Sequence, residues 1–448
     1  MRLLLLSVSI AVLTANALIV TPAIDHRDLG RETLATNDGW ASFSTGTTGG
    51  SSAADNQVYT VHNRRELIAA LNNGVYPPPS STPSSVAKII YVDGVIDANV
   101  DDNNQPLICS DYNRNGYALE AYLAAYDPAV WGRTMVPSGP LENARVASQQ
   151  AQQARVRIRV GSNTTIVGVG KNAVIRGAWF DIRGTANVVG SRTNIIVRNL
   201  TFLDTYDCFP QWDPTDGSLG NWNSAYDSIS LRDSDHVWID HNTFADQETA
   251  DSTLPSYFGR LFQIHDGELD ITNASDLVTV SYNRFLEHDK VMLIGSSDSA
   301  TTDRNKLRVT LHHNLFEQVG QRGPRVRFGK VHVFNNYYWP KNSENYQYSL
   351  GVGRESAIYA ENNFFRTDDS ITPDRFISRL SGTAIHISDT LVNGASDNNL
   401  VDVLAAYNAV NNPDLSSDVG WTPTLFVEIE PTFKVPSAIE SRSGPFNW

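Results

Sequence analysis

The stretch VWIDHNTF (residues 237–244) recurs along the chain with small changes, as VTVSYNRF (278–285) and VTLHHNLF (309–316). Three further segments fit the same pattern: IIVRNLTF (195–202), VHVFNNYY (331–338) and IYAENNFF (358–365). The first position is always Ile or Val and the last is always Phe or Tyr, as expected when alternate residues of a strand face one interior. The six segments therefore form an internal repeat built on strands.

The spacing of the repeat predicts the fold. The six segments start 42, 41, 31, 22 and 27 residues apart, so loops of different lengths separate copies of one unit, and the shortest interval approximates a single coil. We therefore expect an all-β protein, a right-handed parallel β-helix in which each coil adds one strand to each of several parallel sheets. A propeller or sandwich would need hairpin turn signals between the strands, and few are present. One short helix is predicted near the N-terminus, over Arg64–Asn73.

Five of the six segments carry an asparagine at the same, sixth position. Stacked coils would place these side chains about 4.8 Å apart, close enough for their amides to hydrogen-bond along the stack. The simpler alternative is that asparagine favours turns, which explains the residue type but not the shared position. The predicted ladder consists of Asn242, Asn283, Asn314, Asn336 and Asn363.

Composition limits the classes of function. The 448 residues are 41% hydrophobic, so the chain can bury a full core, and disorder is excluded as a global description. The net charge of −14 argues against a general nucleic-acid or anionic-membrane binder. An acidic substrate would therefore need a local basic patch or a metal ion.

The N-terminus predicts export. Residues 1–17 have a basic start, an apolar run and a small-x-small cleavage site, which indicate a secretory signal peptide; a membrane anchor is the alternative, but the apolar run is short for a span. We expect a leader over 18–45 and one catalytic domain over 46–448, with a strap after about Trp421. The mature protein should be a secreted monomer that is free of membranes.

In an oxidising compartment, Cys109 and Cys208 most simply form a disulfide. Two buried free thiols are the alternative, because spacing alone does not show that the sulfur atoms meet.

Three carboxylates precede successive repeats. Asp227 lies ten residues before Val237, and Asp266 and Asp270 lie twelve and eight residues before Val278, so adjacent coils should bring them to one edge. Clustered carboxylates repel one another, which favours a hard divalent cation with oxygen ligands, Ca²⁺ being the usual choice for irregular loops. Alternatively, each aspartate caps a loop. Glu268 could join the group or face solvent.

A basic segment follows this acidic edge. Residues 305–330 contain six Lys and Arg residues against one acidic residue. Lys290 and Arg322 follow the ladder positions Asn283 and Asn314 by seven and eight residues, so stacking should bring them to similar angles, while Arg325 and Arg327 can share one strand face. Guanidinium groups bind carboxylates bidentately, which suits a polymer with one carboxylate per sugar. For any single arginine, a structural ion pair remains the alternative.

These motifs resemble a known family. The segments VWIDHNTF, HDGELD (265–270), HDK (288–290) and QRGPRVRFGKVHVFNNYY (321–338) closely resemble the secreted pectate lyases of polysaccharide lyase family 1. The similarity extends from about Trp40 to about Trp421. It implies a β-helix with a substrate cleft on one flank, formed by long loops such as 112–151 and 247–257, and Ca²⁺-dependent cleavage of polygalacturonate.

The resemblance also implies roles for single residues. Asp227, Asp266 and Asp270 would hold Ca²⁺, and Arg322 would be the catalytic base. Lys290, Arg327 and Arg325 would bind substrate carboxylates. Asp240 and His241 would be structural.

The implied reaction is physically reasonable. β-Elimination removes the C5 proton beside a carboxylate and expels O4, and cations next to that carboxylate stabilise the charge that develops on its oxygens. Arginine normally stays protonated, but neighbouring positive charges would favour its neutral form, so we expect an alkaline optimum.

Three other functions remain open from the sequence. A pectin lyase would share the fold but act on methyl-esterified polymer without Ca²⁺. A polygalacturonase-type hydrolase would need paired acid and base carboxylates. A β-helical adhesin would bind polymer without cleaving it.

Overall fold

The computed structural model describes residues 28–341 and 344–447. The predicted signal peptide, residues 1–17, and the first part of the leader lie outside the described residues. The predicted N-terminal helix is present as α1 (Arg64–Leu71), with Asn63 accepting a hydrogen bond from the Glu66 backbone N–H at its start.

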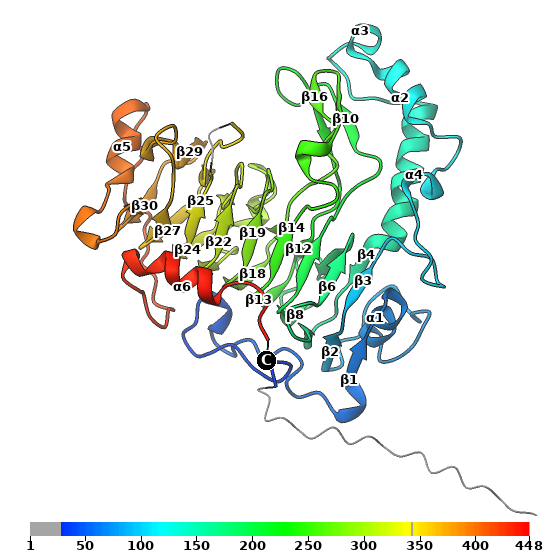
Figure 1. Ribbon diagram of the computed structural model, residues 1–448, viewed down its shortest axis with the longest axis horizontal. Coiled ribbons are helices and arrows are strands. Elements are labelled where there is room, and N and C mark those ends of the chain that lie inside the picture. The colour runs from blue at the N-terminus through cyan, green and yellow to red at the C-terminus, as the bar shows by residue number, and fades with distance from the viewer. Residues whose placement is uncertain (1–27, 342–343, 448) are drawn as a thin grey trace, which may run out of the picture.

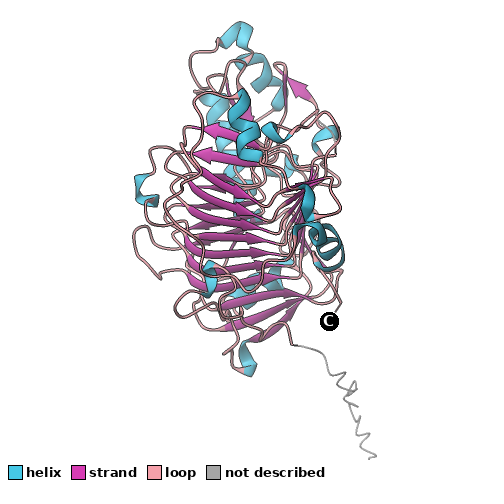
Figure 2. Ribbon diagram, turned by 90° about the vertical axis from the view of Figure 1, so that its left-hand side faces the viewer, coloured by secondary structure: helices cyan, strands magenta, loops and turns pink. Residues whose placement is uncertain are grey.

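Three long parallel sheets dominate the molecule, and their strands stack in a ladder (Figure 2). The ten-stranded sheet contains, in spatial order, β1 (Val58–Val61), β2 (Lys88–Val92), β5 (Thr164–Gly168), β8 (Thr193–Arg198), β13 (Asp235–Asp240), β18 (Asp276–Ser281), β21 (Val309–His312), β24 (Lys330–Phe334), β27 (Ala357–Glu361) and β30 (Ile385–Ser388). The nine-stranded sheet contains β3 (Val95–Asp97), β6 (Val174–Arg176), β9 (Thr201–Leu203), β14 (Thr243–Ala245), β19 (Arg284–Leu286), β22 (Leu315–Glu317), β25 (Tyr337–Trp339), β28 (Phe364–Phe365) and β31 (Leu391–Val392). The eight-stranded sheet contains β29 (Ile377–Leu380), β26 (Leu350–Gly353), β23 (Arg325–Val326), β20 (Leu293–Ile294), β17 (Leu269–Thr272), β12 (Ile229–Arg232), β7 (Trp179–Arg183) and β4 (Arg157–Arg159).

Each coil visits the three sheets in turn. One coil, for example, runs through β12, β13 and β14 before the next begins with β17. This order confirms the predicted parallel β-helix. Each eight-residue repeat therefore spans the end of one strand, a bend, and the start of a strand in the next sheet.

The bend explains the shared asparagine. The fifth residue of each repeat has a positive φ, between 50° and 57°, which bends the backbone sharply between the two sheets. The asparagine that follows is buried, and its side chain bonds to the next coil: Asn242 Nδ2 donates to Asn283 Oδ1 at 3.0 Å, and Asn283 Nδ2 donates to Asn314 Oδ1 at 3.1 Å. The ladder continues to Asn336 and Asn363. The amide ladder is therefore present, beyond a simple preference for turns.

The last position of the repeat forms a second stack. Phe202, Phe244 and Phe285 lie ring on ring with centroids 5.0 Å apart, and the stack continues through Phe316, Tyr338 and Phe365. Together with the inward Val, Ile and Leu side chains of the sheets, these rings form one continuous core along the coil axis. Each coil packs against its two neighbours, as in other solenoids.

Three insertions emerge from equivalent positions, each between a strand of the nine-stranded sheet and the next strand of the eight-stranded sheet. The first carries α2 (Leu119–Tyr126), α3 (Pro128–Trp131) and α4 (Pro140–Val156); the second carries β10 (Gln211–Asp213) and β11 (Asn221–Asn223); the third carries β15 (Ser256–Tyr257) and β16 (Arg260–Leu261). Together they form a tower above the coils (Figure 1). Residues 112–151, which were expected to form a loop, are mostly helical, and their apolar side chains pack in a separate core in the tower.

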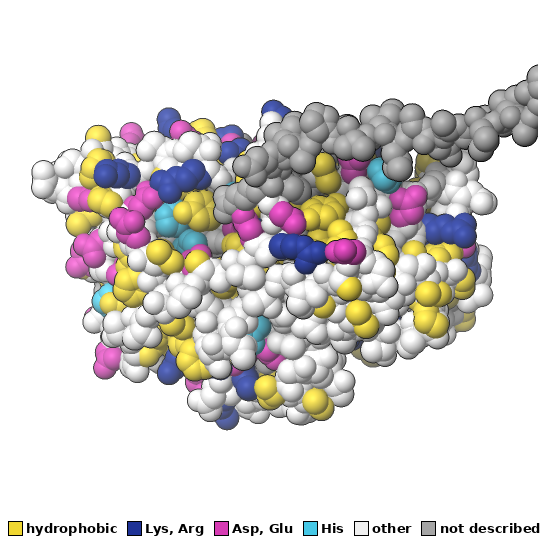
Figure 3. Space-filling model, turned by 90° about the horizontal axis from the view of Figure 1, so that it is seen from below, with side chains coloured by type: hydrophobic (Ala, Val, Ile, Leu, Met, Phe, Trp, Pro, Cys, Tyr) yellow, Lys and Arg dark blue, Asp and Glu magenta, His cyan; other side chains and the backbone are white. Residues whose placement is uncertain are grey.

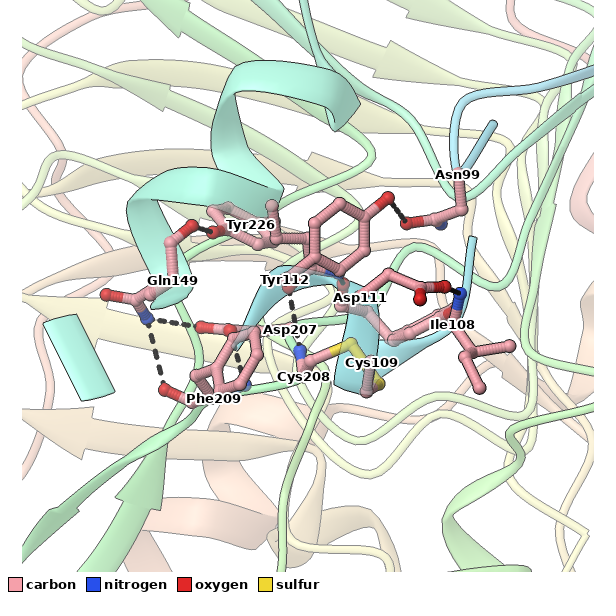
Figure 4. Close-up of a disulfide and its surroundings, with 12 residues drawn as sticks. Asn99, Ile108, Cys109, Asp111, Tyr112, Gln149, Asp207, Cys208, Phe209 and Tyr226 are labelled. Atoms are coloured by element: carbon pink, nitrogen blue, oxygen red, sulfur yellow. Dashed lines mark hydrogen bonds between the residues drawn. A yellow bond between two sulfur atoms is a disulfide. The ribbon is translucent and has the colours of Figure 1, made fainter. Parts of the chain in front are cut away.

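A disulfide ties this tower together. Cys109 and Cys208 are bonded, which confirms the prediction. Around the bond, Tyr112 Oη donates to Asn99 Oδ1 at 3.0 Å, and Tyr226 Oη donates to the Gln149 carbonyl at 2.6 Å (Figure 4). The disulfide and the hydrogen bond between Tyr226 and Gln149 therefore join the first and second insertions.

The C-terminal part packs along the coils. After α5 (Val403–Val410), the chain returns along the nine-stranded sheet, where α6 (Val435–Arg442) buries Val435 and Ile439 against Leu315 and Tyr337. The face of the molecule shown in Figure 3 carries acidic and basic side chains interspersed with apolar ones. Within the described ranges, no helix is long and apolar enough to cross a membrane.

Candidate active site

Four charged residues occupy equivalent positions on successive coils. Asp227, Asp266, Lys290 and Arg322 each lie two or three residues before a strand of the eight-stranded sheet, namely β12, β17, β20 and β23. The coils stack directly, because the residue before Arg322 forms a parallel bridge with Lys290. The structure thus brings together residues that are up to 95 positions apart in the sequence.

The three aspartates share one small space beside Gly267. The Gly267 backbone N–H donates to Asp227 Oδ1 at 3.1 Å, and Asp270 Oδ1 accepts from the Leu293 backbone N–H at 3.0 Å. A β-carbon on Gly267 would lie 2.6 Å from Asp270 Oδ1 and 3.1 Å from Asp227 Oδ1, so both carboxylates flank this glycine. Glycine leaves room for their oxygens to converge.

The carboxylates destabilise one another as anions. Burial, followed by the charges of Asp270 and Asp266, raises the pKa of Asp227 well above its usual range. Burial and the charge of Asp266 raise the pKa of Asp270 to about 6, although Arg322 acts in the opposite direction. Such a group gains most from a bound cation, because the cation supplies the positive charge that the site lacks.

Two basic side chains border this acidic edge. Lys290 Nζ lies 3.5 Å from Asp266 Oδ1. Arg322 has a φ of 62°, and its carbonyl accepts from the Met292 backbone N–H at 2.9 Å, which fixes the backbone. Its Nε is buried without a hydrogen-bond partner among the described residues, so this donor is available to a ligand.

The other two candidate arginines differ in their surroundings. Arg325 also has a buried Nε without a partner in the described part of the chain, and burial together with the charge of Arg327 lowers its pKa. Arg327 is 8% exposed, and it is already ion-paired: its Nε lies 2.7 Å from Asp298 Oδ1, and Nη1 donates to the Gly295 carbonyl at 2.9 Å. A substrate carboxylate would have to compete with Asp298 for Arg327.

A buried ionic network lies directly behind the acidic edge. Oxygen and nitrogen atoms of Asp246, Glu268 and His288 lie within 4.8 Å of one another, a spacing that could hold a metal ion. However, His288 Nδ1 lies 2.7 Å from Asp246 and 3.4 Å from Glu268, and its Nε2 lies 2.8 Å from the Asp266 carbonyl oxygen. The imidazole therefore occupies the position between the carboxylates, and their charges raise the pKa of His288 although burial opposes this.

This network was not identified from the sequence. Glu268 is buried and accepts a hydrogen bond from Ser228, so the expectation that it joins the aspartates or faces solvent was wrong. Asp246 and His288 went unrecognised. The only feature of the sequence that pointed to this network was the position of His288, two residues before Lys290 in the HDK triplet.

Asp240 and His241 lie at the bend between the ten-stranded and nine-stranded sheets, away from this edge. Asp240 is buried and contacts Arg198 Nη2, His241 Nδ1 and Ser281 Oγ at 2.7 to 2.8 Å. Although burial would raise it, the charges of His241 and Arg198 hold the pKa of Asp240 at about 2. The His241 ring stacks on Tyr282, with centroids 4.8 Å apart. Both side chains therefore link neighbouring coils.

A cleft of about 860 Å³ opens beside the basic residues. Lys290, Gln321 and Arg322 line its floor, Trp222 and Arg260 of the tower line one wall, and residues 344–347 contribute to its border. The cleft is predominantly polar in its lining residues, as expected for a carbohydrate or another hydrophilic polymer rather than an apolar ligand.

Comparisons with known proteins agree with this architecture. A family model described as pectate lyase matches residues 138–399. A pectate lyase of Bacillus subtilis (strain 168) is 47% identical over 436 residues, covering 96% of this chain and 97% of that protein. Pectate lyase E of Dickeya dadantii (strain 3937) is 32% identical, covering 87% of this chain and 83% of that protein.

Solved structures give the same result. A pectate lyase bound to a hexasaccharide superposes with a TM-score of 0.85 at 46% identity, covering 94% of this chain and 99% of that one. The thermostable pectate lyase PL 47 gives a TM-score of 0.87 at 47% identity, covering 94% and 100%.

Proposed function

The chain belongs to the pectate lyase family, and from this premise we propose that it cleaves α-1,4-linked polygalacturonate by Ca²⁺-dependent β-elimination. The products would be oligogalacturonates with a 4,5 double bond at the new end. The observation that carries this proposal is the single edge at which Asp227, Asp266 and Asp270 meet Lys290 and Arg322.

The aspartates suit a calcium ion. Asp227 and Asp270 are held by backbone N–H groups, and their mutual repulsion is compensated only in part by Lys290 and Arg322. Oxygen ligands of this kind, presented by irregular loops, match the preference of Ca²⁺. When bound, the cation would neutralise the substrate carboxylate and make the adjacent C5 proton more acidic.

The basic side chains suit the elimination itself. Lys290 would bind the same carboxylate and stabilise the charge that spreads onto its oxygens. Arg322 would accept the C5 proton through its guanidine group; the C5–H electrons form the C4=C5 bond, and O4 departs with its electron pair and takes a proton from solvent. Arg325 and, after exchange with Asp298, Arg327 would hold carboxylates of neighbouring sugars.

The direct test follows the ultraviolet absorbance of unsaturated product from polygalacturonate, with Ca²⁺ and with chelator. We expect activity that requires Ca²⁺ and that increases toward alkaline pH. Arg322→Ala should lower kcat by at least about 1000-fold, as expected for loss of a general base together with a stabilising charge. Arg65→Ala, which removes an exposed arginine from α1, is the matched control and should retain full activity.

Each rival function has its own outcome. Activity that survives chelation and prefers methyl-esterified polymer would indicate a pectin lyase. Chain cleavage without an ultraviolet product would indicate a hydrolase. Polymer binding without cleavage, unaffected by Arg322→Ala, would indicate an adhesin, and a rate that peaks below pH 6 would contradict the role of Arg322.

We also propose that the protein is exported and acts as a monomer. The Cys109–Cys208 disulfide supports export, because such bonds persist mainly in oxidising compartments. Fractionation of the native host, with detection of the protein by antibody, tests the location. Light scattering of the purified protein tests the monomer.

A further inference from the structure

A second, smaller cavity of about 180 Å³ lies beside β4 and β7, the strands at one edge of the eight-stranded sheet. Three arginines line it, Arg159 on β4, Arg183 on β7, and Arg192 before β8, together with the loop residues Ser81–Pro83. We call it the arginine pocket. Asp181 is its one acidic lining residue, so three guanidinium groups face one carboxylate.

The charges of this pocket are incompletely compensated. Asp181 pairs with Arg183 Nε at 3.2 Å. Arg159 Nη1 and Arg192 Nε donate to the carbonyls of Ser81 and Arg183, which are neutral acceptors. Arg192 is 5% exposed, and its Nη1 is buried with no hydrogen-bond partner in the described part of the chain. A buried guanidinium N–H that lacks a partner is unfavourable, and an anion in the pocket would supply the missing hydrogen bond.

A buried lysine adds to the positive field. Lys88 is fully buried behind the pocket, and burial followed by the charge of Arg192 lowers its pKa to about 8. Its Nζ donates to the Ser84 carbonyl at 3.0 Å, again a neutral acceptor.

The pocket and the acidic edge lie on the same sheet. Arg159 pairs in register with Asp181, Asp181 with Ser230, and Ser230 with Asp270. Arg232, which is in register with Arg183, lies between the two sites and lowers the pKa of both Asp227 and Asp270 against the dominant effect of burial. Arg183 and Arg232 therefore extend positive charge from the arginine pocket toward the proposed site of elimination.

The distance between the two sites suits a long ligand. Five strand spacings separate β4, which carries Arg159, from β23, which follows Arg322. At about 4.8 Å per spacing this is roughly 24 Å, more than a trisaccharide bound at Arg322 is expected to reach. Only a longer polymer could occupy both places at once.

We propose that the arginine pocket is a remote subsite that binds the carboxylate of a uronic acid unit several sugars away from the scissile bond. This inference rests on the proposed function, because it assumes that the polymer in the cleft is polygalacturonate. Bidentate guanidinium–carboxylate pairing would provide the contact. Because the second contact is intramolecular once the polymer is bound, it would increase the affinity for long chains without changing the chemistry.

The test compares chain lengths. In the double variant Arg159→Gln/Arg183→Gln, we expect KM for long polygalacturonate to rise at least fivefold with kcat unchanged, whereas both constants for trigalacturonate stay as in the wild type. Arg192→Gln should give the same pattern. Arg192 is buried, so its replacement could impair folding, but a folding defect would not reproduce the pattern of the double variant. Arg65→Gln, an exposed arginine on α1, should behave as the wild type.

A second measurement does not depend on catalysis. Native electrophoresis through a gel that contains polygalacturonate and chelator should retard the wild type more than the double variant, with a polymer-free gel correcting for the change in charge. An unchanged KM for long polymer, a parallel rise for trigalacturonate, or equal retardation would each overturn the subsite. If instead the wild type released no unsaturated product, the proposed function would fail, while the gel would still report on the pocket.

Discussion

At the scale of single residues, Gly267 determines how closely the carboxylates of Asp227 and Asp270 can approach each other. Replacing it with alanine would put a β-carbon 2.6 Å from Asp270 Oδ1 and 3.1 Å from Asp227 Oδ1. Both oxygens are at the ends of side chains, so the carboxylates would turn away from the new β-carbon while the backbone around residue 267 stays in place. We expect Gly267→Ala to weaken Ca²⁺ binding, measured by calorimetry, by about tenfold or more, equivalent to about 1.4 kcal/mol.

The metal-free protein provides the control for this change. Its unfolding temperature in chelator should fall only slightly in Gly267→Ala, because the change disturbs just the two hydrogen bonds that Asp227 and Asp270 accept from the backbone N–H groups of Gly267 and Leu293. Asp251→Asn, which removes a carboxylate from the cleft wall but not from the aspartate group, should keep the wild-type affinity. A Gly267→Ala protein with unaltered Ca²⁺ affinity would show that the three aspartates do not bind the ion together.

Asp240 gives a prediction about pH. Its pKa is about 2 in the folded protein, against 3.8 for an unperturbed aspartate, so its ionised form stabilises the fold above pH 3.8, and this stability is lost as the pH falls through 2. The difference between these two pKa values corresponds to a stabilisation of the fold by about 2 kcal/mol at pH 6 and by less than about 1 kcal/mol at pH 2.5. The gap in unfolding free energy between the wild type and Asp240→Asn, measured in urea, should therefore narrow as the solution is acidified. A gap that stays constant from pH 6 to pH 2.5 would show that the ionised form of Asp240 contributes no stability.

At the scale of elements, the asparagine ladder links five successive coils, from the coil of Asn242 to that of Asn363. Asn283 Nδ2 donates to the carbonyls of Ile239 and Ser281 at 2.9 Å and to Asn314 Oδ1 at 3.1 Å. In Asn283→Asp the isosteric side chain would place a carboxylate oxygen against these three acceptors. We expect the unfolding free energy to fall by about 3 kcal/mol or more.

A surface asparagine serves as the comparison. Asn115 is exposed in a turn and also has a positive φ, a conformation that aspartate tolerates, so Asn115→Asp should change stability by less than about 0.5 kcal/mol. If Asn283→Asp proved equally mild in calorimetry, the ladder would contribute no more than the ordinary preference of asparagine for turns.

The same elements show how far the sequence determines the structure. The coils were predictable because strand alternation and the aromatic position of Phe285 recur in all six segments, and the asparagine position of Asn283 recurs in five of them. Several copies therefore support one interpretation. The positions of Asp227, Asp266 and Arg322 followed from the same stacking. The tower could not be derived this way, because its segments occur once and pack on each other, and Glu268 was misjudged because its partner His288 comes from the next coil.

At the scale of the whole molecule, the two largest hydrophobic cores among the described residues are separate. The larger core runs through the coils, and the smaller one lies in the tower, where Tyr122, Phe209, Trp212 and Trp222 pack together. The buried ion pair of Arg145 with Glu142, at 2.7 Å, lies in the tower as well, on α4. Because the tower forms one wall of the cleft, its stability bears on substrate binding without contributing to the proposed chemistry.

The disulfide should therefore stabilise the tower more than the coils. Cys109 and Cys208 are 99 positions apart, and a loop of that length contributes roughly 4–5 kcal/mol through the entropy of the unfolded chain. In Cys109→Ser/Cys208→Ser we expect hydrogen exchange to accelerate over residues 109–150 and 208–223, while β13 and β18 keep their protection, because coil-to-coil contacts do not depend on the bond. KM for polygalacturonate should rise with the loss of the cleft wall. Equal loss of protection in tower and coils would mean instead that the two cores unfold as one cooperative unit.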